Sequence, residues 1–464
     1  MESLLSYDTN INQLVCFIIQ YKNITIHTQN NINKIHKILQ INNNYNLLHH
    51  YTIIGPKLNY KTPWCSNVLE IFKKSNINYI SRIEKFILYK SPYDLLFDVN
   101  TMQIYNSLPK TLNSTLKPEL TYTIPIDTIS EVNKNMNLAM DQNDLTFYTN
   151  LYKYKLKRDP TNVELFDLAQ SNSEHSRHWI FNGKLIIDNI EKPDSLFKLV
   201  KQPFIKNPNN SILAFCDNSS AIKGFTIDLL LNKFDKTLKH NQELTKIKEE
   251  YNIAFTAETH NFPTGIAPFQ GANTGIGGRI RDNLAIGKGG TIIASTAGYC
   301  VGEIINNKHT PALEILIEAS NGASDYGNKI GEPVIQGFTR SFKQNINNLD
   351  YEWIKPIMFT GGIGQVSTKN LLKDAPNTNM LIIQIGGLAY KIGLGGGSAS
   401  SKENSNVDNY SAVQRGDPEM ANRLYRVVRF LSENNIIKSI HDQGAGGMAN
   451  VTKEIISPLG GKVY

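Results

Sequence analysis

The stretch AETHNFPTGIAPFQGANTGIGGRIRDNLAIGKGG, residues 257–290, holds acid, imidazole, guanidinium and glycine more densely than folding alone requires. It follows an apolar, strand-like run at 251–255, opens with Glu258 and His260, and reaches Asp282 after paired arginines. Glycines let backbone N–H groups approach oxyanions closely, and carboxylates at both ends can hold Mg²⁺ between phosphate oxygens. The stretch therefore predicts a site for a phosphorylated ligand; the structural alternative is a glycine-rich hairpin with incidental charges.

Composition describes a globular protein of several domains. The chain has 464 residues, of which 41% are hydrophobic and 19% charged, and this length predicts about two to four domains. The net charge of +7 comes from dispersed basic residues without interleaved aromatics, so nucleic-acid binding is not predicted. Asn, Ile and Lys are in visible excess, as drift toward AT-rich codons would produce. A single surface lysine is therefore not evidence of a functional site.

Cysteine spacing and hydropathy exclude several classes of protein. Cys16, Cys65, Cys216 and Cys300 lie far apart without C-x-x-C spacing, which indicates neither a zinc site nor a disulfide framework. The first residues lack a signal peptide, and no run reaches the roughly 18 apolar residues of a membrane span. We expect a reduced, cytoplasmic protein without a membrane partner.

The first 125 residues have the rhythm of a small α+β domain. Strands are expected at 14–19, 51–54 and 86–89, and Ser66 is a candidate N-cap for a helix of apolar residues at helical spacing. The histidines of this part have no partners at ligand spacing, so surface or packing roles are expected for them.

Residues 130–182 turn helical and polar. Asp144 can cap one helix and Pro160-Thr161 can open another. His175 and His178 follow at a spacing that places both on one face of a helix. A zinc pair more often has i, i+4 spacing and needs a third ligand, so phosphate or substrate contact is favoured over a metal. A solvated polar helix end is the alternative.

The remaining sequence predicts a β-rich domain to about residue 354 and then an α/β unit. Strands are expected at 313–317, 356–360 and 380–386, and helices include 419–433. The polar stretches are 217–220, the turn-rich loop 320–328, 393–398, 414–419 and 441–447. None matches a P-loop or a dinucleotide fingerprint, so the phosphate site is of another kind. The last element, 451–456, runs into a glycine turn, and the chain looks cut short.

Several long motifs occur in order along the chain. They are SEHSRHWIFN (173–182), ETHNFPTGIAPFQGANTGIGGRIRD (258–282), TAGYC (296–300), ASNGASDYGNKIGEPVIQGFTRSF (319–342), KPIMFTGGIGQ (355–365), GLGGGSASS (393–401), VQRGDPEM (413–420) and HDQGAGG (441–447). Together they closely resemble the large form of phosphoribosylformylglycinamidine synthase, the ATP-dependent amidotransferase family of purine biosynthesis. The resemblance is dense from about residue 158 onward and extends weakly to 62–64 and 81–84.

The resemblance implies that ATP phosphorylates the amide oxygen of formylglycinamide ribonucleotide, and that ammonia then displaces phosphate to give the amidine. ATP and Mg²⁺ are the implied cofactors, because an amide oxygen leaves poorly until it is phosphorylated and the metal neutralises the moving charge. The implied metal ligands are Glu258, Asp282 and Asp442. The implied partners are a glutaminase domain or subunit that releases ammonia, and a second synthetase half in cis or in trans.

The same resemblance implies the other site residues. His175 and His260 match the catalytic imidazoles, and the sequence leaves the division of proton transfer between them open. The implied substrate contacts are Arg281 and Gln414, and the implied ATP contacts are His178, Gly275, Gly277 and Gly278. Ser176 stands where the family usually has cysteine, an isosteric change at a position without a nucleophilic role.

The implied fold is a multidomain α+β protein in which two synthetase halves surround a central barrel. Its parts here are a small N-terminal α+β domain (1–128), a helical linker (129–183), a β-rich ATP-binding synthetase domain (184–354) and an incomplete α/β domain of the aminoimidazole-ribonucleotide-synthetase-like superfamily (355–464). Neither the second half nor the glutaminase is present, so a split subunit, a fragment and a remnant remain open.

Two other functions compete with this one. A non-catalytic scaffold could keep the fold, bind nucleotide and dock a partner chain, but it has no reason to keep Glu258, His260, Asp282, Gln414 and Asp442 together. A related synthetase that forms aminoimidazole ribonucleotide fits the stretch at 258–282 less well.

Overall fold

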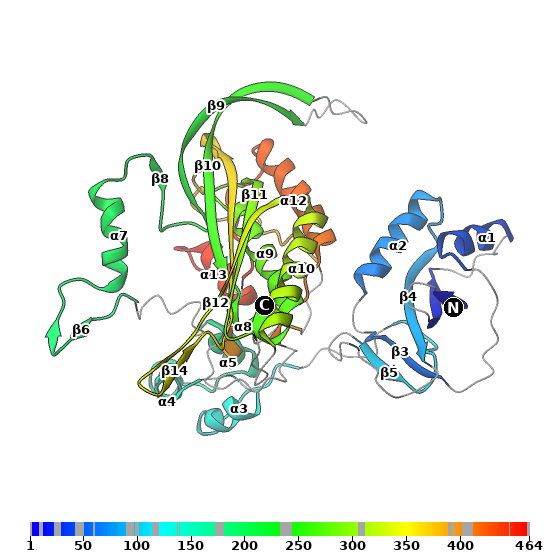
Figure 1. The fold of residues 1–464 in the computed structure, drawn as a ribbon, viewed down its shortest axis with the longest axis horizontal. Helices are drawn as coiled ribbons and strands as arrows, with labels where there is room; N and C mark the ends of the chain where they lie inside the picture. Colours follow the sequence, from blue (N-terminus) through cyan, green and yellow to red (C-terminus); the bar gives the residue numbers. More distant parts are fainter. Residues whose placement is uncertain are drawn as a thin grey trace. The chain divides into compact units, whose positions relative to one another are not determined.

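A computed structural model describes the chain in ranges separated by gaps. These are residues 2–8, 13–22, 29–41, 51–58, 61–89, 97, 102–113, 120–136, 138, 140–171, 181–232, 244–304, 311–387, 392–393, 396–400, 412–444 and 446–461. The chain forms two compact units, Met1–Leu120 with Leu388–Ile392, and Thr121–Gly387 with Gly393–Tyr464. Each unit mixes helices and strands (Figure 1), which confirms the predicted α+β class.

The first unit is a five-stranded antiparallel sheet with two helices. In sheet order its strands are β1 (Glu2–Asp8), β2 (Gln13–Tyr21), β4 (Ile80–Tyr89), β3 (Thr52–Pro56) and β5 (Met102–Tyr105), and its helices are α1 (Gln29–Ile38) and α2 (Pro63–Lys74). Strand β2 is apolar at successive positions because both of its faces are covered. Phe17 and Ile19 pack with the helices, whereas Cys16 and Ile18 pack in a second cluster. The three strands predicted in this unit are confirmed.

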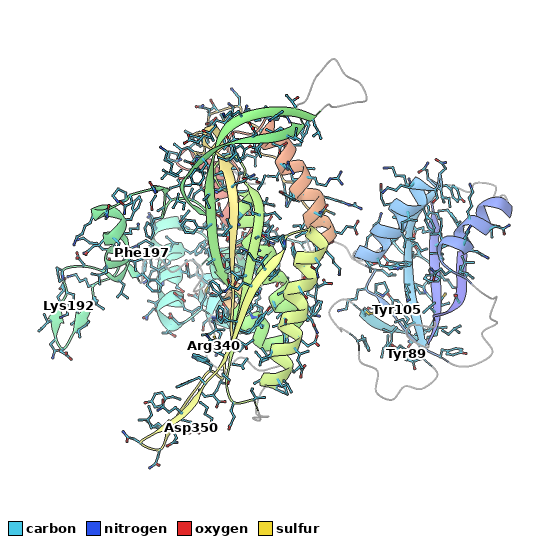
Figure 2. The ribbon with its side chains drawn as sticks, turned by 45° about the horizontal axis from the view of Figure 1, so that its top comes forward. Tyr89, Tyr105, Lys192, Phe197, Arg340 and Asp350 are labelled. Atoms are coloured by element: carbon cyan, nitrogen blue, oxygen red, sulfur yellow. The ribbon has the colours of Figure 1, made fainter. Side chains whose placement is uncertain are left out.

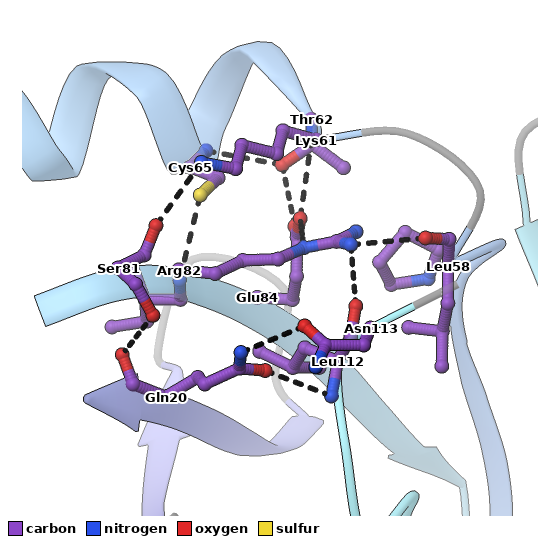
Figure 3. A network of polar contacts seen from close by, with 12 residues as sticks. Gln20, Leu58, Lys61, Thr62, Cys65, Ser81, Arg82, Glu84, Leu112 and Asn113 are labelled. Carbon is purple, nitrogen blue, oxygen red and sulfur yellow. Dashed lines mark hydrogen bonds and ion pairs between the residues drawn. The ribbon is translucent and has the colours of Figure 1, made fainter. Parts of the chain in front are cut away.

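A buried carboxylate on β4 holds the start of α2 against the sheet (Figure 3). Glu84 Oε2 accepts a hydrogen bond from Thr62 Oγ1 at 2.6 Å, and Oε1 accepts one from Arg82 Nε at 2.9 Å. Arg82 Nη1 also donates to the carbonyls of Leu58 and Leu112, at 2.9 and 2.6 Å. Burial raises the pKa of Glu84, although Thr62 and Arg82 oppose the shift. The two sequence motifs that extend the resemblance into this unit thus meet in one polar network.

Two helices begin earlier than predicted. Thr62 Oγ1 accepts from the Cys65 N–H at 3.0 Å and caps α2, so the predicted cap at Ser66 is wrong. Asp141 caps the helix that Asp144 was expected to cap, and the two aspartates form a reciprocal capping box. In both helices the observed cap is a Thr or Asp side chain that accepts from the third residue after it.

The second unit begins with a helical segment, as predicted. Its elements are η1 (Ile126–Thr128), α3 (Ile129–Asn135), α4 (Gln142–Asn150), the π-helical η2 (Leu151–Leu156) and α5 (Asn162–Ser171). Buried side chains of these elements share one small core. Helix α5 begins after Thr161, where the Glu164 N–H donates to Thr161 Oγ1 at 3.1 Å and Glu164 Oε2 accepts from the Thr161 N–H at 2.9 Å.

A hairpin and a helix follow. They are β6 (Ile186–Ile187), β7 (Ile190–Glu191) and α7 (Leu196–Lys206). In α7, Phe197 and Phe204 pack on Phe215 with ring centroids 6.3 and 6.0 Å apart, and Lys201 Nζ lies 4.4 Å from the Phe197 ring centroid. This aromatic cluster fixes α7 beside residue 215, which lies in the connection between two strands of the main sheet.

A six-stranded sheet forms the body of the second unit. In sheet order its strands are β12 (Val334–Ser341), β11 (Thr291–Val301), β15 (Ile357–Ser367), β10 (Leu244–Thr259), β9 (Ser220–Asn232) and β8 (Ser211–Leu213). Only the β11–β12 pair among these is parallel. The hairpin of β13 (Lys343–Ile346) and β14 (Leu349–Glu352) projects from the β12 end, with Asp350 near its tip (Figure 2). The predicted strands at 251–255 and 356–360 lie in β10 and β15, so both are confirmed.

Helices cover one face of this sheet (Figure 1). They are α9 (Pro268–Leu284), α10 (Ala312–Ile330) and α12 (Pro418–Glu433). Ile276, Ala323 and Val428 of these helices share a core with Tyr299 and Met358 of the sheet. The shorter elements of the unit are α8 (Asn261–Ile266), η4 (Thr368–Asn370), α11 (Gly396–Ser400) and α13 (Gly447–Ile456). In the described ranges every helix is too short or too polar to cross a membrane.

Helix α10 corrects two predictions at once. The strand expected at 313–317 and the loop expected at 320–328 are successive parts of this helix. Its buried side chains recur every three or four residues: Ala312, Ile315, Ala319, Ala323, Tyr326 and Ile330. A short apolar run fits a strand or a helix equally well, and packing against α9 decides for the helix. Gly331 ends the helix in the left-handed region at φ 88°, where glycine is favoured.

The strand expected at 380–386 is also wrong. These residues have no regular secondary structure, and Leu381 and Ile383 are 87% and 71% exposed. An apolar run becomes a strand only where a neighbouring strand can pair with it, and the described part of the chain offers this segment none. The helix predicted at 419–433 is confirmed by α12.

Candidate functional site

The structure brings acidic residues together from distant parts of the chain. Glu258 lies at the end of β10, Asp282 in the last turn of α9, and Asp442 in the segment between α12 and α13. Asn218, between β8 and β9, bridges two of them. Its Nδ2 donates to Asp442 Oδ1 at 2.7 Å and to Asp282 Oδ1 at 3.4 Å. We call Glu258, Asp282 and Asp442 the carboxylate cluster.

Electrostatic interactions within the carboxylate cluster are strong. The pKa of Asp282 is raised to about 9, first by burial, then by a hydrogen bond with Glu258 and by the charges of Asp442 and Glu258. Adjacent buried carboxylates cannot all ionise unless a cation compensates them. The donors are all oxygens, which is the ligand type that Mg²⁺ takes. The residue types therefore fit the implied metal.

The geometry does not by itself define a metal site. Within the described ranges, no three His, Cys, Asp or Glu side chains converge as ligands of one ion. The carboxylates influence one another without facing a common point. Their assignment as metal ligands therefore stays a prediction.

The paired arginines of α9 have different surroundings. Arg279 is fully buried and forms a two-pronged ion pair with Glu332, in which Nη1 lies 2.7 Å from Oε1. It ties α9 to the residues that lead into β12. The Arg281 side chain is 31% exposed, and its Nε lies 3.7 Å from Asp442 Oδ2, beside the carboxylate cluster. Of the two arginines, only Arg281 lies where it could contact a molecule bound at the carboxylate cluster. Its role as a substrate contact stays a prediction.

Asp217 and Lys373 support the cluster and were not predicted. Lys373 Nζ lies 2.8 Å from Asp217 Oδ1 and donates to Asn218 Oδ1 at 3.2 Å. Asp217 Oδ2 accepts from the Gly287 N–H at 3.0 Å. The stretch at 217–220 was recognised in the sequence as one of several polar stretches, whereas nothing distinguishes Lys373 from other single lysines.

His260 lies between the sheet and α9. Its backbone N–H donates to the backbone carbonyl of Met358 at 2.9 Å. Its Nδ1 lies 2.5 Å from the Gly271 carbonyl and 3.4 Å from Thr274 Oγ1. A carbonyl only accepts hydrogen bonds, so Nδ1 carries a proton and donates it to Gly271. The ring thus contacts the first turns of α9, whereas Asp282 lies in the last turn.

The predicted ATP-binding glycines lie inside α9, so the glycine-rich stretch is neither a hairpin nor a loop. Interior N–H groups of an α-helix donate to carbonyls one turn earlier, and the expected cradle of free N–H groups is therefore wrong for these residues. A Cβ on Gly275 would lie 3.0 Å from both His260 Cβ and Met358 Sδ. A Cβ on Gly277 would lie 2.7 Å from Tyr326 Cζ, whereas one on Gly278 would meet only Arg281 Nη2, at 3.7 Å.

Alanine substitutions at Gly277 and Gly278 separate packing from binding. We expect Gly277→Ala to destabilise the chain by about 1 to 3 kcal/mol, because the methyl group overpacks the α9–α10 contact at Tyr326. We expect Gly278→Ala to preserve or slightly raise stability, since alanine favours a helix and the space is open. Urea unfolding measures both. Equal destabilisation by the two variants would contradict the packing assignment.

The remaining predicted residues are placed less directly. Gln414 is exposed. Its segment packs closely against α9, because a Cβ added to Gly416 would lie 1.8 Å from Oδ1 of Asn273 in that helix. His175, Ser176 and His178 lie outside the described residues.

Three family models match the chain. The model of the AIR synthase related protein, N-terminal domain, matches residues 239–366, and the corresponding C-terminal domain matches 378–464. The formylglycinamide ribonucleotide amidotransferase linker domain matches residues 129–178.

Similar proteins were found at high identity. A phosphoribosylformylglycinamidine synthase of Dictyostelium discoideum is 46% identical over 89% of this chain and 33% of its own length. The Homo sapiens protein of that name is 40% identical over 89% of this chain and 34% of its own length. The chain thus spans about a third of the length of these curated relatives. A solved structure, Thermotoga maritima PurL complexed with FGAR, is 23% identical over 66% of this chain and 40% of its own, with a TM-score of 0.41.

Proposed function

We propose a function from one premise: the chain belongs to the phosphoribosylformylglycinamidine synthase family. The chain contributes a synthetase half to an ATP-dependent, C–N bond-forming ligase of purine biosynthesis. In the proposed reaction, formylglycinamide ribonucleotide, ATP and glutamine-derived ammonia give formylglycinamidine ribonucleotide, ADP and phosphate.

The carboxylate cluster is the observation that carries this proposal. Glu258, Asp282 and Asp442 come from widely separated segments, and burial, followed by the interactions with Glu258 and Asp442, raises the pKa of Asp282 to about 9. Packing alone does not favour such an arrangement, because every carboxylate in it makes ionisation of its neighbours less favourable. A scaffold without chemistry gains nothing from this repulsion, whereas a site for a divalent cation and phosphate oxygens needs it.

We propose that Mg²⁺ is held by Glu258, Asp282 and Asp442, and that it supplies charge neutralisation when ATP is bound. Arg281, beside Asp442, would contact the substrate together with Gln414. His260 would orient or move a proton through Nε2, with His175 as the second imidazole. His178 and the helical glycines Gly275, Gly277 and Gly278 complete the proposed nucleotide contacts, the glycines as part of the α9 surface and not as a cradle of free N–H groups.

Exposed apolar side chains on the main sheet support a second synthetase half as partner. Phe255 of β10 pairs in register with Ile363 of β15, and both side chains are nearly half exposed, at 44% and 48%. Ile293 and Phe338 on the neighbouring strands are 46% and 40% exposed. Contiguous apolar side chains on a sheet face mark an interaction surface. We propose that the second half covers this face and that a glutaminase domain or subunit supplies ammonia.

Two further assignments belong to the proposal. The chain divides into the four segments 1–128, 129–183, 184–354 and 355–464, and it acts in the cytoplasm. One relative, from Arabidopsis thaliana, is named a probable chloroplastic/mitochondrial synthase.

Reconstitution tests the function. Ammonia-dependent amidine formation is measured with ATP and Mg²⁺, for the chain alone and with the remaining two thirds of a relative supplied in trans. We expect activity only in the mixture, because the sheet face is completed only there. Amidine formation by the chain alone would contradict the proposed division, and an inactive mixture of folded, associated parts would contradict the function.

A further inference from the structure

We infer that Asn218 is a positioning residue that holds Asp282 and Asp442 together without neutralising them. The inference rests on the proposed function, in which the carboxylate cluster receives a divalent cation. Nothing in the sequence distinguishes Asn218 from its polar neighbours at 217–220.

The contacts of the Asn218 amide match its hydrogen-bonding capacity. An amide nitrogen has two hydrogens, and Nδ2 donates to Asp442 Oδ1 at 2.7 Å and to Asp282 Oδ1 at 3.4 Å. Asp282 is on α9, and Asp442 is in the segment before α13. One side chain therefore fixes the separation of two carboxylates that no common element holds.

The orientation of the amide is also fixed. Lys373 Nζ donates to Asn218 Oδ1 at 3.2 Å, so the oxygen faces the lysine and the nitrogen faces the carboxylates. Lys373 is in turn paired with Asp217, at 2.8 Å, and their side chains are 18% and 4% exposed. The Gly287 N–H holds the other oxygen of Asp217 at 3.0 Å. Backbone, carboxylate, ammonium and amide thus form one chain of contacts that ends at the cluster.

A neutral donor suits this position. An arginine or lysine at residue 218 would form an ion pair with Asp282 and Asp442 and compete with a metal for their charge. Lys373, the ammonium that donates to Asn218, is compensated by Asp217. The amide therefore orders Asp282 and Asp442 without adding a second positive charge to that of Arg281, which lies 3.7 Å from Asp442.

Binding of Mn²⁺ alone, followed by electron paramagnetic resonance of the 464-residue chain, tests the inference. Asp442→Asn first locates the bound ion and should remove the signal of the bound state. We expect Asn218→Leu to weaken Mn²⁺ binding about 10- to 100-fold, as loss of a group that orients metal ligands does. Lys373→Met should weaken it in the same direction while leaving the amide in place.

Lys369→Met is the matched control, because Lys369 pairs with Glu249 at 2.9 Å and contacts none of the cluster. Its Mn²⁺ affinity should equal that of the parent. If Asn218→Leu and Lys373→Met both bind Mn²⁺ as the parent does, the inference is wrong while the metal site stands. If the parent binds no Mn²⁺, or binds it equally after Asp442→Asn, the proposed metal site and the inference both fail.

Discussion

Asp442→Asn is expected to lower amidine formation by the reconstituted enzyme by more than about a hundredfold, because even outer contacts of metal ligands contribute 10- to 100-fold. The substitution preserves shape and removes one charge from the carboxylate cluster. It also leaves Arg281, whose Nε lies 3.7 Å from Asp442 Oδ2, without its ionic partner. Turnover at saturating ATP and substrate, measured across a range of Mg²⁺ concentrations, gives both the maximal rate and the metal requirement.

Asp374→Asn is the control for this experiment. Asp374 forms ion pairs with Lys288 and Lys438, its side chain is 38% exposed, and it is not part of the cluster. We expect its removal to leave turnover unchanged. Glu258→Gln should behave as Asp442→Asn does. Near-parental turnover of both cluster variants would show that the metal assignment is wrong.

Mg²⁺ binding to the chain should strengthen by about tenfold for each pH unit between pH 6 and pH 8, with one proton released per ion bound. Burial, the hydrogen bond with Glu258 and the charges of Asp442 and Glu258 raise the pKa of Asp282 from 3.8 to about 9. The metal-free carboxyl is therefore protonated at neutral pH, and an ion must displace this proton. Titration calorimetry in two buffers of different ionisation enthalpy measures the proton release.

The same shift fixes the sign of the effect on stability. Without metal, the folded chain binds the Asp282 proton more tightly than the unfolded chain does, so stability from this group is full below about pH 4 and falls as pH rises toward 9. Saturating Mg²⁺ should abolish this decline, because its binding tightens as pH rises by the same factor. Asp282→Asn should abolish both the proton release and this part of the pH dependence. Binding without proton release would contradict the raised pKa.

Elements with strong periodicity could be predicted from the sequence. The helix at 419–433 and the strands at 251–255 and 356–360 combine apolar spacing with clear boundaries, and the structure confirms them. Helix α10 was missed because glycine, serine and asparagine at 320–328 are typical of turns. Its apolar stripe packs against α9, α12 and the sheet, and these partners are visible only in three dimensions.

The candidate site, like the fold, could be predicted only in part from the sequence. Glu258, Asp282 and Asp442 lie in dense polar stretches, so their importance could be predicted without knowing that they meet. Lys373 stands in ordinary surface-like sequence, and its contact with Asn218 spans 155 positions of the chain. Because lysine is abundant in this chain, a single lysine does not indicate a functional site. Lys373 is an exception, since its role follows from its tertiary contacts alone.

Residues close together along helix α9 have different roles, because some pack the core and others belong to the candidate site. Gly277 admits Tyr326, Arg279 pairs with Glu332, and Asp282 joins the carboxylate cluster. Most of the helix is buried. Mutational intolerance along α9 therefore cannot identify ligand contacts, because substitutions that loosen the helix and substitutions that remove a ligand contact both abolish activity. Only experiments that record stability and ligand affinity separately for each variant can map the binding surface of this helix.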